Sequence, residues 1–378
     1  MNNIVAIERC TSYEPDEVYR AIKKTVEHAG SPDVKGKTLL LKPNIVFDAD
    51  PKKAICTDPA VLIAAIRLFK EMGAKRILAG DSPGLQTPGF IAKLSGLGRA
   101  AMDNGAEWVD FTREKTEISC DYGKVMKKVS VTRAVKEADL IINLPKLKTH
   151  QLMCFTGAMK NLFGLIPSAA KSTFHVRYPS QRAFASMIVD LNLAIKPVFN
   201  IMDAVIGMEG PGPAAGTPRH IGLILASHNV LAMDIAASQI IAYPPLDIPV
   251  NKEAAARGIW LKDPEEINYP LLKPLDVRIP DFKKIPLKKS RSQLLYFILP
   301  KPIRKLLERS APGPKINHGI CTRCGDCGSI CAPKLISLSS DKKHMIINYR
   351  NCIRCFCCHE ICRFNAIDIV KKPSNDLP

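Results

Sequence analysis

Residues 139–150 read DLIINLPKLKTH, a short apolar run that ends at once in polar and basic residues. The apolar part, 139–143, is too short for a helix, and its composition is what a strand covered on both faces of a sheet requires. Similar short runs recur on both sides of this segment. They occur at 4–8, 38–41, 76–79, 108–111, 197–202 and 222–226.

Amphipathic stretches separate these runs and predict helices. They span 14–29, 59–72, 90–104, 183–195 and 230–242. One further strand, 125–131, is predicted to be antiparallel. Strands that alternate with helices predict an α/β domain over residues 1–282, built on a mostly parallel, covered sheet.

Polar side chains follow four of the predicted strands at the point where each strand ends. They are Lys42, Asn44, Asp81, Lys146, Lys148, His150, Asp203 and Glu209, and Lys160 and Asn161 lie a little further along the chain. Ligands of parallel sheets bind beyond the carboxyl ends of the strands, so we expect these residues to form one binding site. Ordinary loop composition accounts for the Asn and Asp residues. It accounts less well for four lysines near the ends of apolar segments.

Asp234 stands in an otherwise apolar helical context, Leu231 to Ile235. A buried carboxylate needs a polar partner, and we expect one of the site lysines to provide it. The chain contains no phosphate-binding loop, no nucleophile elbow and no zinc-protease helix motif, and its Gly/Pro segment 207–216 does not form a dinucleotide fingerprint.

Nine of the thirteen cysteines lie close together near the carboxyl end of the chain. Eight of them form two runs with the spacing Cys-x2-Cys-x2-Cys-x3-Cys, which is typical of bacterial ferredoxins with two [4Fe–4S] clusters. In that pattern the fourth cysteine of each run ligates the other cluster. The predicted ligand sets are therefore Cys321, Cys324, Cys327 and Cys362 for one cluster, and Cys352, Cys355, Cys358 and Cys331 for the other.

The two runs also form an internal repeat, in which Ile336 and Leu338 of the first half recur as Ile367 and Ile369. We therefore predict a small α+β ferredoxin-like domain over residues 316–372. The alternative is a pair of zinc sites. Zinc usually takes four cysteines as two separated pairs, which fits the observed spacing less well.

Three features depart from the simple pattern. No proline directly follows Cys331 or Cys362. Cys357, the ninth cysteine, is either a spare thiol or a substitute ligand. Arg323 and Arg354 occupy equivalent positions between ligands, where they either favour the reduced clusters or are solvated surface residues.

The formal charge of +18 is strongly basic. Two clusters, each about −2 with its four thiolates, would lower it to roughly +14. This charge favours an acidic redox partner protein and an anionic small molecule. Nucleic acid is not expected, because aromatic stacking residues and DNA-binding motifs are missing.

Residues 283–315 form a linker rich in lysine, arginine and proline. Its basic amphipathic part, 283–309, has two interpretations: peripheral contact with a membrane or an acidic partner, or packing against the large domain. The amino-terminal residues do not form a signal peptide, and no apolar run reaches the ~18 residues of a membrane span. The expected compartment is the cytoplasm.

The order of several motifs resembles the family catalogued as domain of unknown function 362. The motifs are KPN at 42–44, TDP at 57–59, GDSPG at 80–84, LPKLKTH at 144–150, TGAMKNLFG at 156–164, Asp203 with Glu209, and Met233 with Asp234. The resemblance covers roughly residues 3–260. It implies a role in redox or anaerobic metabolism, and several members carry a two-cluster ferredoxin domain at the carboxyl end.

The leading hypothesis is an iron–sulfur oxidoreductase, in which the clusters relay electrons to an anion bound at the sheet edge. His150, Lys148 and Lys146 would act on the substrate, with His150 as proton donor. The remaining predicted residues would bind it: Lys42, Asn44, Asp81, Lys160, Asn161, Asp203, Glu209 and Asp234. A flavin or another organic cofactor is also compatible with the sequence. The alternatives are a non-catalytic electron carrier and a maturation factor for another metalloenzyme.

Overall fold

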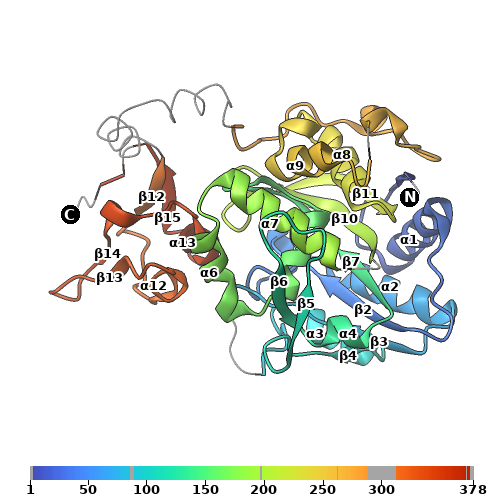
Figure 1. Ribbon diagram of the computed structural model, residues 1–378, viewed down its shortest axis with the longest axis horizontal. Helices are drawn as coiled ribbons and strands as arrows, with labels where there is room; N and C mark the ends of the chain where they lie inside the picture. The colour runs from blue at the N-terminus through green and yellow to red at the C-terminus, as the bar shows by residue number, and fades with distance from the viewer. Residues whose placement is uncertain are drawn as a thin grey trace.

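The computed structural model describes residues 3–85, 89–195, 198–261, 263–287, 312–371 and 373–374. A large α/β part contains the residues up to 287, and a smaller part begins at residue 312 and lies against one side of it (Figure 1). Among the described residues no helix is both long and apolar enough to cross a membrane.

A single sheet forms the centre of the large part. Within the described residues it has nine strands, with the main order β1-β11-β10-β7-β2-β3-β4. The strands of this path are β1 (Ala6–Arg9), β2 (Thr38–Pro43), β3 (Arg76–Ala79), β4 (Glu107–Trp108), β7 (Leu140–Leu144), β10 (Val198–Glu209) and β11 (Thr217–Ser227). The pairs from β10 to β4 are parallel, and β1 and β11 add an antiparallel edge. The predicted α/β class with a mostly parallel sheet is therefore confirmed.

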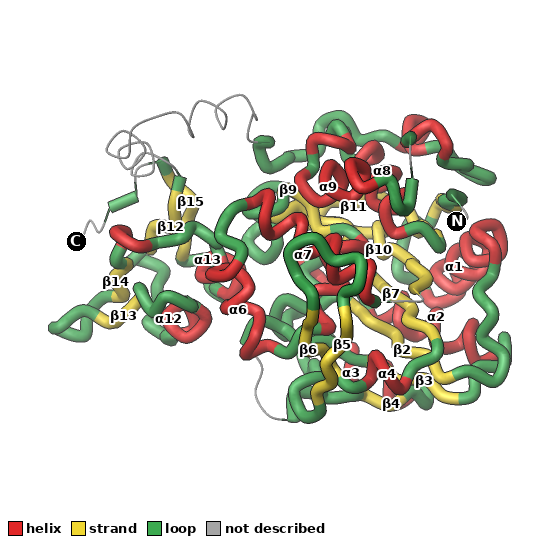
Figure 2. The backbone as a smooth tube through the Cα atoms, in the orientation of Figure 1, coloured by secondary structure: helices red, strands yellow, loops and turns green. Residues whose placement is uncertain are grey.

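Helices cover both faces of the sheet, as the tube in Figure 2 shows. Alternate residues of one strand face opposite layers: Leu39 and Leu41 of β2 pack with α1 (Pro15–Gly30) and α2 (Pro59–Glu71). Leu40 belongs to the other layer. That layer is formed by α5 (Ala158–Asn161), α7 (Gln181–Ala194), α8 (Val230–Ile240) and α9 (Pro249–Arg257).

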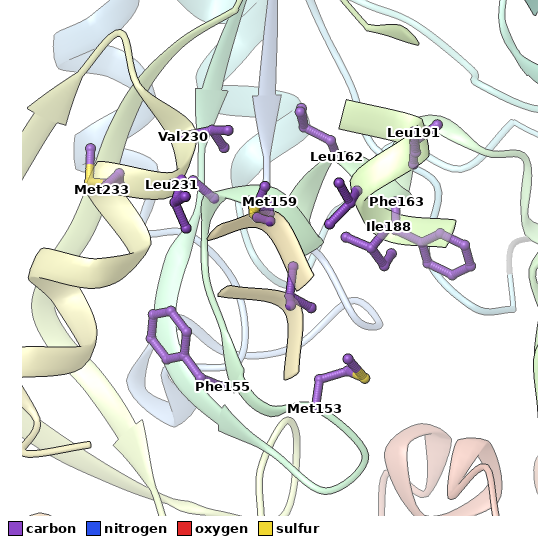
Figure 3. Close-up of a cluster of buried hydrophobic side chains, with 14 of the residues drawn as sticks. Met153, Phe155, Met159, Leu162, Phe163, Ile188, Leu191, Val230, Leu231 and Met233 are labelled. Carbon is purple, nitrogen blue, oxygen red and sulfur yellow. The ribbon is translucent and has the colours of Figure 1, made fainter. Parts of the chain in front are cut away.

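The second layer fixes the short helix α5 in place. Figure 3 shows Met159 and Leu162 in the middle of a cluster that includes Ile188 from α7 and Leu231 from α8. The residues that follow α5 lead into α6 (Ser168–Arg177), which was not predicted from the sequence.

The segment after β7 differs from the expected loop. Residues Lys146–His150 form strand β8, which pairs in parallel with β10 and antiparallel with β9 (Cys154–Thr156). The reason is the length of β10, which continues well past the end of β7 and offers its backbone groups to a further strand. The polar segment is consequently held on a strand of the sheet.

Two other predictions need correction. The helix expected over 90–104 is α3 (Leu97–Asp103) only, because Ala92 and Gly96 adopt positive φ angles that interrupt a helix. The extra strand expected at 125–131 is β6 (Lys128–Thr132), and its partner is the unpredicted β5 (Lys115–Ser119), in a separate two-stranded sheet. The short helix α4 (Ala134–Glu137) follows β6.

The carboxyl-terminal part is a small α+β unit. Strand β12 (Gly313–Ile316) pairs with β15 (Ile367–Val370), and β13 (Ile336–Leu338) pairs with β14 (Met345–Ile347), both antiparallel. The helices are α12 (Asp326–Ile330) and α13 (Cys357–Ile361). The first strand starts before the predicted boundary at 316. Residues 288–311, most of the predicted linker and of its proposed membrane-contacting segment 283–309, lie outside the described residues.

Candidate functional site

The main cavity lies where the carboxyl edge of the sheet meets α6 and α13, which are neighbours in Figure 1. It encloses about 770 Å³ of space, part of which is open to solvent. Seven of the residues predicted for the site line it: Lys42, Asn44, Asp81, Lys148, His150, Lys160 and Asn161.

An ion pair forms one wall. The Nζ atom of Lys42 lies 2.8 Å from Oδ1 of Asp81, and both side chains are almost completely buried. Asp81 also accepts hydrogen bonds from the amides of Ile45 (2.6 Å) and Ser82 (2.7 Å). Gly164 allows this close packing, because a Cβ there would come within 2.2 Å of Asp81 Oδ1. Burial lowers the pKa of Lys42, and the Asp81 carboxylate opposes that effect.

Buried amides continue the wall. Asn161 accepts a hydrogen bond from Asn44 Nδ2 (2.9 Å) and donates to Asn143 Oδ1 (2.8 Å). Asn44 Oδ1 and Thr156 Oγ1 are buried without a hydrogen-bond partner among the described residues. Since both side chains line the cavity, they are available to a bound ligand.

Three further lysines reach the cavity. Lys148 Nζ donates to the carbonyl of Ile55 at 2.5 Å, and Lys171 on α6 donates to the carbonyl of Ser82. Burial lowers the pKa of Lys148 and of Lys171 to about 7. Within the described part of the chain, Lys160 Nζ has no hydrogen bond and no close ion pair, and burial lowers its pKa too. Lys148 is buried and Lys160 and Lys171 are partly buried, and none of the three forms a close ion pair with a described carboxylate, which favours an anionic ligand.

His150 is held in one tautomer. Its Nδ1 accepts hydrogen bonds from the amides of Leu152 (3.1 Å) and Met153 (3.2 Å), so the ring proton must be on Nε2. Nε2 lies 3.0 Å from Oε1 of Glu360 on α13, although the two atoms are not aligned as a hydrogen bond. Burial lowers the pKa of His150 to about 4, so the ring is neutral at pH 7.

Glu360 is ionised at that pH. Burial alone would raise its pKa, but His150 and Lys160 outweigh that effect and the pKa falls to about 2. His175 on α6 also lines the cavity and stacks on Phe184, with ring centroids 4.4 Å apart. Burial lowers the pKa of His175 to about 4.

Lys146 and Asp203, both predicted for the site, lie outside the cavity and bind each other. Lys146 Nζ is 2.8 Å from Asp203 Oδ2 and 2.6 Å from the Tyr13 hydroxyl. Tyr13 in turn donates to Asp203 Oδ1 at 2.8 Å, and the amide of Asp58 donates to Oδ2 at 2.9 Å. This network uses two of the three donors of Lys146, and Lys146 does not line the cavity. Its contacts are those of a structural residue.

Asp234 and Glu209 are also elsewhere. Asp234 accepts hydrogen bonds from the amides of Ala158 (2.5 Å) and Met159 (3.1 Å), and burial raises its pKa to about 7. The prediction that a lysine is the partner of Asp234 is therefore wrong, because the first backbone amides of α5 donate the hydrogen bonds to its carboxylate. Gly157 cannot carry a Cβ, which would lie 2.1 Å from Asp234 Oδ1. Glu209 accepts from the Lys283 amide at 3.0 Å.

The lining residues that were not predicted for the site include four with polar or charged side chains: Thr156, Lys171, His175 and Glu360. Thr156 is the first residue of the TGAMKNLFG stretch, and its residue type alone does not indicate a role. Lys171 and His175 belong to α6, whose weak amphipathic pattern gave no helix prediction. Glu360 lies inside the second cysteine run, far along the chain from the other site residues, and no local signal points from it to the sheet.

The cysteines line two smaller cavities. Cys321, Cys324, Cys327 and Cys362 line one of about 350 Å³. Cys331, Cys352, Cys355, Cys357 and Cys358 line one of about 380 Å³. Among the described residues no three His, Cys, Asp or Glu side chains stand close enough together to hold a single metal ion. In each of the two cysteine cavities the thiols are spread around a space larger than a single metal ion needs. This arrangement suits a cluster in which each of four thiolates binds a different iron.

The family described as domain of unknown function (DUF362) matches residues 39–239. The chain belongs to this DUF362 family. The match contains every cavity residue from Lys42 to Pro213, including Lys171 and His175, and ends well before α13. The DUF362 match therefore excludes the cysteine segment and Glu360.

A thylakoid-associated protein of Synechocystis sp. is 30% identical over 284 residues, which cover 74% of this chain and 87% of that protein. Two solved structures are similar at a TM-score of 0.40. One is a Thermotoga maritima protein at 15% identity and the other the lactate racemase apoprotein of Thermoanaerobacterium thermosaccharolyticum at 12%. The matches cover 67% and 60% of this DUF362 chain and only 61% and 54% of those structures, a similarity too low for any functional argument.

Proposed function

We propose that this protein is an iron–sulfur redox protein, in which two [4Fe–4S] clusters in the carboxyl-terminal part relay electrons to an anion in the main cavity. One observation carries the proposal: the lysine-rich cavity of the α/β part is closed by Cys357, Glu360 and Ile361 of α13, the helix that belongs to the second cysteine run. A cationic cavity and a cysteine cavity thus share a wall.

The cysteines fit the proposed clusters. Each of the two sets derived from the ferredoxin-like spacing lines its own cavity, with the fourth cysteine contributed by the other run. Apolar side chains surround both sets, for example Ile316 and Ile367 in one and Ile336 and Ile347 in the other. When bound, such clusters supply single electrons.

The anionic nature of the ligand follows from charge. Four lysines line the cavity, Lys42, Lys148, Lys160 and Lys171, against the two carboxylates Asp81 and Glu360. Asn44 Oδ1 would accept a hydrogen bond from a hydroxyl or amino group of the ligand. His150, neutral with its proton on Nε2, would donate a hydrogen bond to it.

A non-catalytic electron carrier for an acidic partner is the second candidate. It is favoured by the exposure of Cys324 and of Ile320 and Phe364, which would bring one cluster close to a docked protein. A carrier needs no ligand in the main cavity. Binding of an anion there separates the two candidates.

Anaerobic purification tests the proposal directly. We expect about eight iron and eight sulfide per chain and a broad visible absorption that bleaches on reduction. Denaturation of the protein should release a small anion, which mass spectrometry should detect. Zinc in place of iron, or iron without sulfide, would contradict the assignment of clusters. A bound flavin would add a cofactor that the cysteines alone do not explain.

Anion binding should weaken as the pH rises. In the free cavity the pKa of Lys148 and of Lys171 is about 7, and an anion binds their protonated forms and raises both values. Affinity should therefore be highest below pH 7 and fall by roughly tenfold or more per lysine between pH 7 and 9. Sulfate is the probe, because its charge stays constant over this range.

Calorimetry in two buffers with different ionisation enthalpies should show proton uptake on sulfate binding near pH 7.5. His150 does not contribute, because it is neutral throughout this range. Sulfate affinity that is constant from pH 6 to pH 9 would contradict a role for these two lysines.

A further inference from the structure

The two cysteine cavities are not equivalent in their relation to the main cavity. Cys357 lines both the main cavity and the cavity formed by Cys331, Cys352, Cys355 and Cys358. None of the first set, Cys321, Cys324, Cys327 and Cys362, lines the main cavity. The ninth cysteine therefore forms a single layer of side chain between one of the two proposed clusters and the proposed ligand.

Helix α13 is packed into the α/β part firmly enough to serve as a common wall. His359 on this helix has its Nε2 3.1 Å from the carbonyl of Pro211 and its Nδ1 2.6 Å from the carbonyl of Ile367. Cys357 and Ile361 belong to the same buried cluster as Phe47 and Ile45. The contact of His359 with Pro211 and this apolar contact hold α13 at the cavity.

The first cysteine set faces outward instead. Cys324 is exposed, and the neighbouring Ile320 and Phe364 have 49% and 46% of their surface accessible. In the second set Cys358 is buried and none of the four cysteines is exposed. One cysteine cavity is thus accessible from solution, and the other is enclosed against the lysine-rich cavity.

We propose that the cluster held by Cys331, Cys352, Cys355 and Cys358 is the one that exchanges electrons with the ligand in the main cavity and whose spectrum responds to that ligand. Cys357 is the positioning residue between the cluster and the ligand. This inference rests on the proposed function. The Cys357 thiol is the wall against which the anion lies, and it is not a cluster ligand. The cluster of the first set then takes up electrons at the outer surface.

The test uses the whole protein, purified and reduced without oxygen, and electron paramagnetic resonance (EPR) with and without sulfate. We expect sulfate to shift the signal of one cluster only, with the same concentration dependence as calorimetric binding. Substitution Cys355→Ser should alter the sulfate-sensitive signal, and Cys324→Ser the insensitive one. Where a serine variant fails to assemble its cluster, the loss of that signal identifies it equally well.

Cys357→Ala is the decisive variant. It should retain about eight iron, keep the signal of the outer cluster, and change the sulfate-induced shift of the inner one. Cys120→Ala, which removes another buried thiol that lines neither cavity, should leave both signals and the sulfate response unchanged.

Two results would overturn the inference. One is a sulfate shift in the outer signal, in both signals equally, or in neither although calorimetry shows sulfate bound. The other is the loss of four iron in Cys357→Ala, which would make Cys357 a ligand. A protein that assembles no clusters, or binds no sulfate, would instead refute the proposed function from which the inference starts.

Discussion

Replacement of Lys160 by methionine is expected to weaken sulfate binding roughly 30- to 150-fold, the equivalent of about 2–3 kcal/mol for a lost charged hydrogen bond. Lys160 is the lysine of the cavity that has no hydrogen bond or close ion pair to another described residue, so its ammonium group is available to a ligand. Lys160 forms no hydrogen bond or close ion pair within the described part of the folded protein but does help to keep Glu360 ionised, so the thermal stability of the variant should change little. Calorimetry and thermal unfolding measure the two effects separately.

Lys252→Met is the matched control. It removes an exposed lysine from α9, far from the cavity lining, and should change neither sulfate affinity nor stability by a measurable amount. Equal losses of affinity in the two variants would show that sulfate responds to the overall basic charge. That result would contradict the assignment of the cavity as an anion-binding site.

Lys146→Met should have the opposite effect: folding is weakened by about 3–5 kcal/mol, while each folded molecule still binds sulfate. The substitution leaves the Asp203 carboxylate buried without its ammonium partner, and Asp58 nearby already has its pKa raised to about 6 by burial and by Asp203. For an α/β part of this size the melting temperature should fall by roughly 6–20 °C. Trp108 and Trp260, the only tryptophans, both lie in that part and report on its unfolding alone.

The double variant Lys146→Met/Asp203→Leu distinguishes the cause. Removal of both charges should restore much of the lost stability, because two apolar groups of similar size tolerate burial better than one unpaired charge. Loss of sulfate binding in folded Lys146→Met, with a normal melting temperature, would contradict the structural role of the Lys146–Asp203 pair. It would indicate instead that Lys146 contacts the ligand.

The contrast between these two lysines could not be predicted from the sequence. Both follow predicted strands and both lie in motifs of the same family, so the pattern assigned them the same function. Alternation along a strand does not separate them, because Lys146, Lys148 and His150 are two residues apart and would lie on the same side of a regular strand. Lys148 and His150 of β8 face the cavity, whereas Lys146 reaches Asp203 and Tyr13. The difference lies in the pairing with β10: Lys146 is opposite Asp203 and Lys148 is opposite Met208, with a register shift between the two pairs. This pairing could not be predicted because residues 145–150 were expected to be a loop.

Other predictions depended on strictly local signals and were confirmed. The short apolar strands, the helices between them and the α/β class follow from periodicity and from proline and glycine positions. The two cysteine sets also follow from spacing, although their clusters stay a prediction. The helix at 90–104 was overestimated, because Ala92 and Gly96 adopt positive φ angles that interrupt it.

The sequence by itself determined the fold class, the family, and the chemical character of the two regions: lysines at strand ends in one and thiols in the other. Only the tertiary structure decided which lysines share a cavity, that Asp234 binds backbone amides at the start of α5, and that Glu360 and Cys357 complete a site more than a hundred residues away along the chain. The physical reason is that these contacts arise from packing between α13 and the sheet edge. Such contacts leave no periodic or compositional trace in either segment.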